Sequence, residues 1–177
     1  DTNDALTSVT GDGDDTVTLT AEFNGTATNL LVLTVEQGGD FIANTVTTIN
    51  TEADATIANT DVDFVYGTNT ETVTLSNDFA GTAQGIADLF LGGKTNGVIT
   101  SDSNLLNLTL TDGTNAVVTE LQNADMLTSI TGAAGTDAVT LTGNGTGTIV
   151  TTALETLNVN QNAVVDNDVA LSTLDGA

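Results

Sequence analysis

The sequence predicts an all-β protein, and its internal repeats favour a parallel β-helix or β-roll-like solenoid over the alternative, an antiparallel β-sandwich. Threonine supplies 37 of the 177 residues, and Thr and Val both suit a half-buried pleated surface. Apolar and polar residues alternate in short segments that end at Gly, Asn and Asp clusters, as expected for strands joined by turns. A turn-and-strand motif also recurs along the chain, which is typical of stacked architectures.

Alternation with a period of two predicts strands at six places, over residues 16–22, 30–36, 70–76, 105–111, 138–142 and 154–159. Two stretches, residues 81–90 and 116–127, have an ambiguous pattern. In the first, Ile86, Leu89 and Phe90 recur at helical spacing although Gly85 weakens a helix. We therefore expect at most one short helix, over residues 81–90.

Three segments repeat the same pattern of a Gly-rich acidic turn followed by Val-Thr-Leu. They read ALTSVTGDGDDTVTLT from Ala5, DFVYGTNTETVTLS from Asp63 and MLTSITGAAGTDAVTLTG from Met126. The first two align without a gap, and the third needs one inserted residue. The last residues, 169–177, resemble residues 4–12. We expect one continuous array over residues 1–177, made of imperfect repeats at about 4–59, 60–122 and 123–177, that begins and ends inside its own repeat.

The composition excludes several classes of function. With 24 acidic residues, one Lys and no His, the formal net charge is −23, so the surface should repel nucleic acids and anionic membranes. No apolar run approaches a membrane span, so we expect no membrane insertion. The chain has no Cys, His or Arg, which removes the usual triads, zinc sites and arginine clamps. We therefore expect no enzymatic activity.

One acidic turn resembles a calcium-binding motif. Residues 10–18 read T-G-D-G-D-D-T-V-T, against the nonapeptide G-G-x-G-x-D-x-U-x, in which U is a large apolar residue. Calcium takes six to eight oxygen ligands, so Asp12 and Asp15 would supply carboxylates, and Gly11 and Gly13 would supply carbonyl groups. Asp14 would point outward or toward a second ion. In the third copy Asp137 keeps the acidic position. The alternative is that these are ordinary β-turns, in which Gly, Asn and Asp recur for backbone reasons.

The repeats LTSVTGDGDDTVTLT and LTSITGAAGTDAVTLTG, together with ALETLNVN from Ala153, resemble bacterial surface-layer (S-layer) and related RTX-type secreted repeat proteins. This resemblance implies an extracellular protein of the bacterial cell surface, calcium-dependent folding or lattice formation, and a parallel β-roll or β-helix.

Two functional hypotheses follow. The first is a non-enzymatic structural protein, stabilised by calcium, that assembles head to tail with copies of itself into an extracellular surface layer or filament. The second is a calcium-rigidified adhesin or stalk module of a larger secreted repeat protein. Cell-surface polysaccharide is a further candidate partner.

Overall fold

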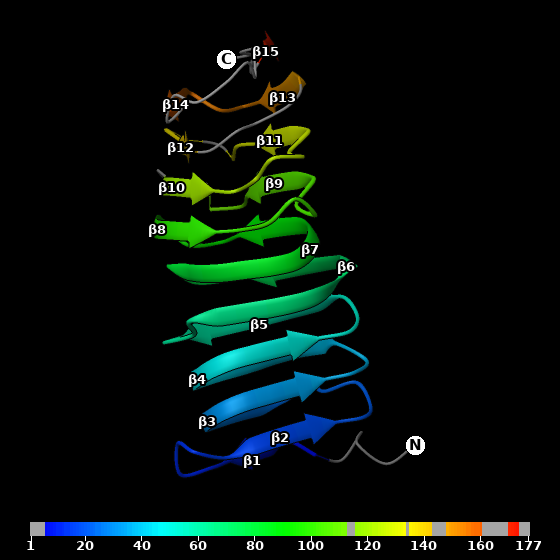
Figure 1. Cartoon of the computed structure of the whole chain (residues 1–177). Coiled ribbons are helices and arrows are strands. Elements are labelled where there is room, and N and C mark those ends of the chain that lie inside the picture. The colour runs from blue at the N-terminus through cyan, green and yellow to red at the C-terminus, as the bar shows by residue number, and fades with distance from the viewer. Residues whose placement is uncertain (1–5, 113–115, 134, 143–147, 161–169, 174–177) are drawn as a thin grey trace.

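The computed structural model describes residues 6–112, 116–133, 135–142, 148–160 and 170–173. These residues form a β-solenoid of about eight coils, seen as a stack of strands in Figure 1. They contain no helix, and so no helix that could cross a membrane. The fifteen strands are β1 (Ser8–Thr10), β2 (Thr16–Leu19), β3 (Thr26–Val35), β4 (Gly39–Thr51), β5 (Ala55–Thr60), β6 (Phe64–Leu75), β7 (Gly81–Leu91), β8 (Thr95–Thr100), β9 (Asn107–Leu110), β10 (Val117–Gln122), β11 (Ser129–Thr131), β12 (Ala138–Thr142), β13 (Thr148–Thr152), β14 (Thr156–Asn160) and β15 (Ala170–Thr173).

Stacked coils form two parallel sheets, which we call face 1 and face 2. Face 1 consists of β2, the second halves of β3 and β4, the first parts of β6 and β7, and then β8, β10, β12 and β14. Face 2 consists of β1, the first halves of β3 and β4, then β5, the second parts of β6 and β7, and β9, β11, β13 and β15. Every one of these pairings is parallel. The predicted parallel solenoid is therefore confirmed, and the antiparallel sandwich is wrong.

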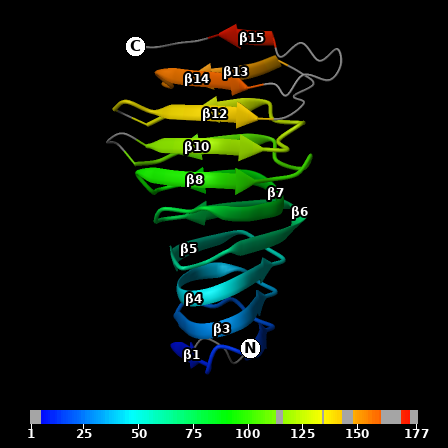
Figure 2. The same ribbon diagram turned by 60° about the vertical axis from the view of Figure 1, so that its left-hand side comes forward.

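The coils lengthen along the chain. On face 2, Thr26 pairs with Ile42, 16 residues later, whereas Asn107 pairs with Ser129, 22 residues later. Figure 2 shows the stack broadening accordingly toward its C-terminal end. Each predicted repeat of about 60 residues thus covers several coils, and part of the tail of residues 169–177 lies outside the described residues.

Four long strands turn from one face to the other at a residue with positive φ. β3 and β4 bend at Asn29 (φ 56°) and Thr45 (φ 54°), whereas β6 and β7 bend at Asn69 (φ 92°) and Gly85 (φ 68°). At these bends the β3–β4 pairing skips the residues with positive φ and the β6–β7 pairing shifts register, and each strand then continues on the other face. The short helix expected over residues 81–90 is wrong for this reason: the apparent helical spacing spans a bend at Gly85, and β7 occupies the whole segment.

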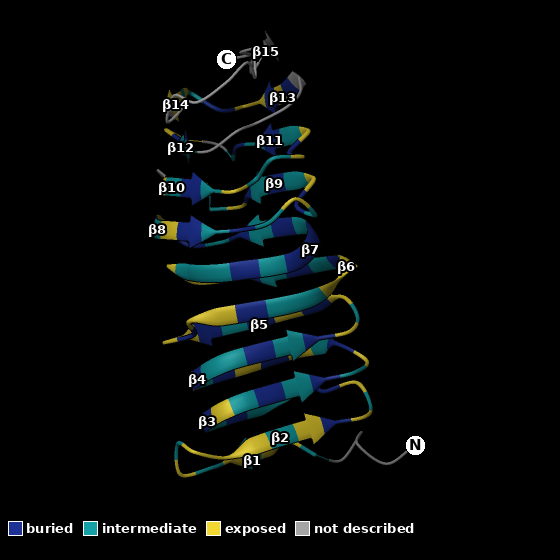
Figure 3. Cartoon of the chain, in the orientation of Figure 1, coloured by how far each residue is buried: buried dark blue, intermediate teal, exposed yellow. Residues whose placement is uncertain are grey.

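The interior is filled by ladders of apolar side chains that repeat once a coil. One ladder on face 2 runs through Phe41, Ile57, Leu75, Leu91 and Leu110, all of them buried. The Phe23 ring extends this ladder by packing on Phe41, with ring centroids 5.7 Å apart. Figure 3 shows the resulting alternation of buried and more exposed positions along the strands. Small branched side chains suffice because the two faces enclose a thin core.

Replacing Ile57 with Ala should lower the free energy of unfolding by about 2–5 kcal/mol, because the cavity would interrupt this ladder between Phe41 and Leu75. The matched control is Ile42→Ala, since Ile42 on β4 is 44% exposed, and it should cost less than about 1 kcal/mol. Urea unfolding followed by circular dichroism measures both. Equal losses would mean that burial in the ladder does not determine stability.

Candidate functional site

The three sequence repeats form the same turn. In each copy, an acidic side chain accepts a hydrogen bond from the N–H group that follows a glycine. Asp15 and Asp137 come just before a strand, whereas Glu71 lies inside β6, after its bend. The Asp12 N–H donates to Asp15 Oδ2 (2.9 Å), the Thr68 N–H to Glu71 Oε2 (2.6 Å), and the Ala133 N–H to Asp137 Oδ2 (2.6 Å). The donor lies three residues before the acid in the first two copies and four before it in the third, where the sequence has its inserted residue. We call this arrangement the carboxylate-clamped turn.

The glycine of the motif is required by close approach. A Cβ atom at Gly11 would lie 2.6 Å from Asp15 Oδ2, one at Gly67 would lie 2.6 Å from Glu71 Oε2, and one at Gly132 would lie 2.9 Å from Asp137 Oδ2. At Gly67 and Gly132 a backbone carbonyl oxygen of the next coil lies closer still, that of Gly85 at 2.4 Å and that of Ala153 at 2.0 Å. In these two copies the carboxylate and the neighbouring backbone together occupy the space that a side chain would fill, so glycine is required there.

The turn of residues 11–15 brings five of the predicted metal ligands together. Gly13 has φ 106°, which suits glycine, and its N–H donates to the Asn29 carbonyl (2.9 Å). Asn29 Nδ2 donates in turn to the Gly11 carbonyl (3.1 Å). The Asp14 N–H donates to Asp12 Oδ1 (3.3 Å). Hydrogen bonds from the protein therefore engage one oxygen each of Asp12 and Asp15, and the Gly11 carbonyl.

The sixth predicted ligand, Asp137, lies elsewhere. It precedes β12, and β3, β4, β6, β7, β8 and β10 separate it from β2 on face 1. Its carboxylate is fully buried and accepts the Ala116 N–H (3.1 Å) as well as that of Ala133. Across the described residues, no three acidic side chains converge in a way that could hold a metal ion. The structure thus brings five of the six predicted ligands together in one turn and places Asp137 several coils away.

Glu71 is the clamp with the clearest electrostatic signature. It is only 3% exposed, and burial raises the pKa of its carboxyl group. Hydrogen bonds from the Thr68 hydroxyl and from the backbone of Thr68, Glu71 and Thr70 outweigh that effect, so the pKa lies below the ordinary 4.5. Glu71 is therefore held ionised by the turn that it closes.

Acidic residues are concentrated in the turns. Among the described residues the strands contain four acids, Asp40, Glu71, Asp88 and Glu120, and the other fifteen lie between strands. Several turn acids also accept hydrogen bonds from the neighbouring coil. Asp54 accepts the Thr72 N–H (2.8 Å), and Asp78 accepts the Thr95 N–H (3.0 Å). These acids continue the backbone ladder around the corners.

Asparagine performs the same role at other corners, and the sequence analysis missed it. Buried Asn96 accepts the Phe79 N–H (2.9 Å). Asn59, 2% exposed, accepts the Asn77 N–H (3.0 Å) and donates to the Asp78 carbonyl (3.0 Å). The available signal was the recurrence of Asn and Asp at the coil spacing, which varies too much to be seen as a fixed period.

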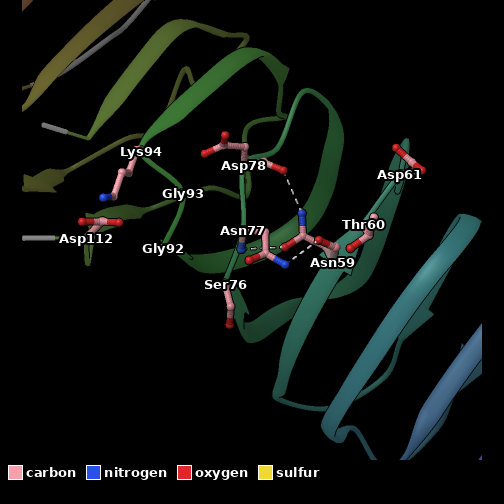
Figure 4. Close-up of a pocket in the computed structure, with 10 residues that line it drawn as sticks. All are labelled: Asn59, Thr60, Asp61, Ser76, Asn77, Asp78, Gly92, Gly93, Lys94 and Asp112. Atoms are coloured by element: carbon pink, nitrogen blue, oxygen red, sulfur yellow. Dashed lines mark hydrogen bonds between the residues drawn. The ribbon is translucent and has the colours of Figure 1, made fainter. Parts of the chain in front are cut away.

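The Asn59 corner lines a polar groove, shown in Figure 4 with Asn77, Asp78, Gly92, Gly93 and the neighbouring residues. Lys94, the only basic residue of the chain, lies beside Asp112 at one end of this groove. No aromatic residue lines it. The groove is therefore lined by amide and acidic side chains, and one of them, Asn59, forms hydrogen bonds to Asn77 and Asp78 on the next coil.

No protein-family model, curated protein or solved structure matches this chain. The arguments for function therefore depend on its own residues and fold.

Replacing Glu71 with Gln should lower the free energy of unfolding at pH 7 by about 1–3 kcal/mol, because the buried clamp loses its charge-assisted hydrogen bonds. The pKa of Glu71 is lowered on folding, so its contribution is present above pH 4.5 and is lost as the pH falls through the folded pKa. The difference between wild type and E71Q should therefore shrink in acid.

Urea titrations at a series of pH values provide the measurement. Glu52→Gln is the control, since it removes the same charge from an exposed turn residue and reports the general relief of repulsion. A pH dependence shared by E71Q and E52Q would contradict the clamp.

Proposed function

We propose that this protein is a non-enzymatic structural subunit that assembles head to tail with copies of itself into an extracellular layer or filament at the bacterial cell surface. The observation that carries the proposal is the pair of strand edges at opposite ends of the stack. Within the described residues, β1 and β2 pair only with β3, β14 pairs only with β12, and β15 pairs only with β13.

The two ends match face by face. β2 and β14 belong to face 1, and β1 and β15 belong to face 2, so stacking one copy on the next would continue both faces as parallel sheets. Such a contact is heterologous and propagates into an open filament unless the rotation closes it. Proteins usually protect such edges with Lys or Pro, and residues 6–20 contain neither.

The carboxylate-clamped turn of residues 11–15 also has an acceptor that a neighbouring copy could use. In the third copy, Asp137 Oδ1 accepts the N–H of Ala116 from the preceding coil. Asp15 holds the equivalent position on the first coil, and among the described residues only the Asp12 N–H donates to its carboxylate. A copy stacked against β1 and β2 would supply a second donor, as Ala116 does for Asp137 inside the chain.

Stacking also brings acids together, which supports a role for calcium. Glu155 precedes β14 at the same corner that Asp12, Asp14 and Asp15 occupy before β2. Head-to-tail contact would place these carboxylates near one another, and their repulsion opposes assembly unless a cation reduces it. We propose calcium in this role at the junction, where the oxygens of two copies add up, because the described residues of one chain hold no cluster of three acidic side chains.

The open edges also support a second candidate, a calcium-rigidified adhesin or stalk module of a larger secreted repeat protein. In that case the strands next to β1, β2, β14 and β15 would come from further coils of the same chain. In both cases we propose a structural role, which is supported by turn carboxylates such as those of Asp15, Asp54 and Asp137 that accept backbone N–H groups. Cell-surface polysaccharide is the proposed partner beyond other copies.

Replacing Thr18 with Pro should abolish assembly while leaving the single subunit folded. The carbonyl groups of Asp15 and Leu19 accept hydrogen bonds from β3, so Thr18, at an alternate position, directs its N–H toward the open edge. Thr18→Ala is the control because it keeps that N–H. Sedimentation and electron microscopy at increasing protein concentration are the measurements. Filaments formed equally by T18P and T18A would exclude pairing through β2.

Removing divalent cations with EDTA should dissolve the assemblies and lower the melting temperature, because carboxylate repulsion returns. Replacing Asp12 and Asp14 together with Asn should make assembly less dependent on calcium, whereas the same change at Asp61 and Asp63, another exposed corner pair, should not. Light scattering during calcium titration distinguishes these results. Assembly and melting that are unchanged in EDTA would rule out structural calcium.

A further inference from the structure

Face 1 differs from the rest of this acidic protein because its strands are almost uncharged. Among the described residues of its strands, Glu120 is the single charged side chain. Its more exposed positions hold mainly Thr, Asn, Gln and Val. The charge of the molecule instead lies at the corners that border this face, including Asp61 and Asp63 beside the start of β6.

Two aromatic rings lie side by side in the middle of face 1. Phe64 and Tyr66 point outward from β6 on either side of buried Val65. Their ring centroids are 6.2 Å apart and their planes are inclined by only 10°. Phe64 is 37% exposed. Together they form a short aromatic strip on a face whose other outward positions are mainly Thr, Asn and Gln, with exposed Val98 on β8 and Val159 on β14.

Polar side chains flank this strip in register. Thr48 and Thr82 lie beside Phe64 on the neighbouring strands, and Asn50 and Gln84 lie beside Tyr66. Asn50 donates to the Thr34 hydroxyl (3.2 Å). The Tyr66 hydroxyl, the Gln84 amide and the hydroxyls of Thr48 and Thr82 have no hydrogen-bond partner among the described residues. Adjacent strands are about 4.8 Å apart, so donors and acceptors surround the rings at close and regular spacing.

We propose that this surface, the Phe64–Tyr66 strip with its flanking Thr, Asn and Gln residues, binds an uncharged polysaccharide. A sugar ring presents an apolar C–H face, which suits an aromatic strip, and hydroxyl groups, which suit amides and hydroxyls. The acidic corners on both sides repel polyanions. A neutral polymer lying along the stack meets similar side chains at every coil, so many weak contacts add up.

This inference specifies the polysaccharide partner named under the proposed function, but it does not depend on head-to-tail assembly. The surface lies on a face of the coils, whereas assembly uses the edges of the end strands. The two proposals can therefore fail separately.

Affinity electrophoresis gives a direct test. Native gels are cast with neutral laminarin, dextran or mannan, which do not migrate, or with the polyanion alginate at the same mass. The charge of −23 drives the protein through the gel, so binding appears as retardation. We expect retardation by at least one neutral polymer, none by alginate, and no weakening in 0.5 M salt, since on the order of 0.5 M salt screens only charge.

Three variants locate the surface. Phe64→Ala should weaken binding about tenfold without changing the melting temperature, because Phe64 is partly exposed. Phe90→Ala is the matched control, since Phe90 is partly exposed in the corresponding outward row of face 2, between Thr74 and Thr109. Tyr66→Phe should weaken binding less than F64A. Tyr66 is the only Tyr and there is no Trp, so the intrinsic fluorescence of the wild type should change on titration with the polymer that retards it.

Absence of retardation by all three neutral polymers, or equal losses in F64A and F90A, would overturn the proposal. If F64A instead reduced self-association in sedimentation, face 1 would be an interface between copies and the polysaccharide proposal would be wrong. The T18P variant, which blocks the end edges, should still bind the polymer. A failure of assembly alone therefore leaves this test intact.

Discussion

Hydrogen bonding at the corners is the constraint on which this solenoid depends. Along the two faces, each coil satisfies the backbone of the next through parallel ladders, but a ladder is interrupted wherever the chain turns. Buried N–H groups at such places must find another acceptor. The chain supplies it from Asp, Glu and Asn side chains. The carboxylate-clamped turns of Asp15, Glu71 and Asp137 satisfy the turn itself, while Asp54, Asp78 and Asn96 reach the neighbouring coil.

This constraint explains much of the charge. Acids are poor strand residues but good acceptors in turns, so a solenoid with many corners accumulates them there. The coils are stacked at strand spacing, and the corner acids are therefore stacked as well. One Lys cannot compensate them, so the fold gains hydrogen bonds at the cost of repulsion along its corners. Dissolved cations reduce repulsion of this kind.

The sequence predicts the fold class because alternation and Thr content report directly on half-buried strands. It does not reveal the coil length, since each coil contains two turns and the clamped turn occurs at either of them. From Gly11 the same corner recurs near Asn29, Thr45 and Asp61, and Gly67 lies at the opposite corner, half a coil further. The visible repeat is thus three and a half coils long, and successive copies lie on alternate corners.

Part of the candidate site, the turn of residues 11–15, could be predicted from the sequence. Gly11, Asp12, Gly13, Asp14 and Asp15 form one turn because they are consecutive, as predicted. Their partners were not foreseeable, since Asn29 meets Gly11 only through the strand register. A glycine close to an acid in the sequence is compatible with a metal-binding loop and with a carboxylate-clamped turn, because in both a carbonyl or carboxylate oxygen lies close to the backbone of the glycine. The positions of the N–H groups that donate to the carboxylate distinguish the two, and these are known only from the structure.

The low charge of face 1 follows from the same placement of acids at the corners. Its outward strand positions hold mainly Thr, Asn, Gln and Val, and negative corners border it, whereas the strands of face 2 contain Asp40, Glu71 and Asp88. Rows of like charge repel polyanions, whereas an uncharged polymer meets no such barrier at face 1. At the two ends of the stack, the described strands β1, β2, β14 and β15 each pair on one side only. The proposed self-assembly would use these end strands and the proposed polysaccharide binding would use face 1, so the two proposals require different surfaces of the same fold.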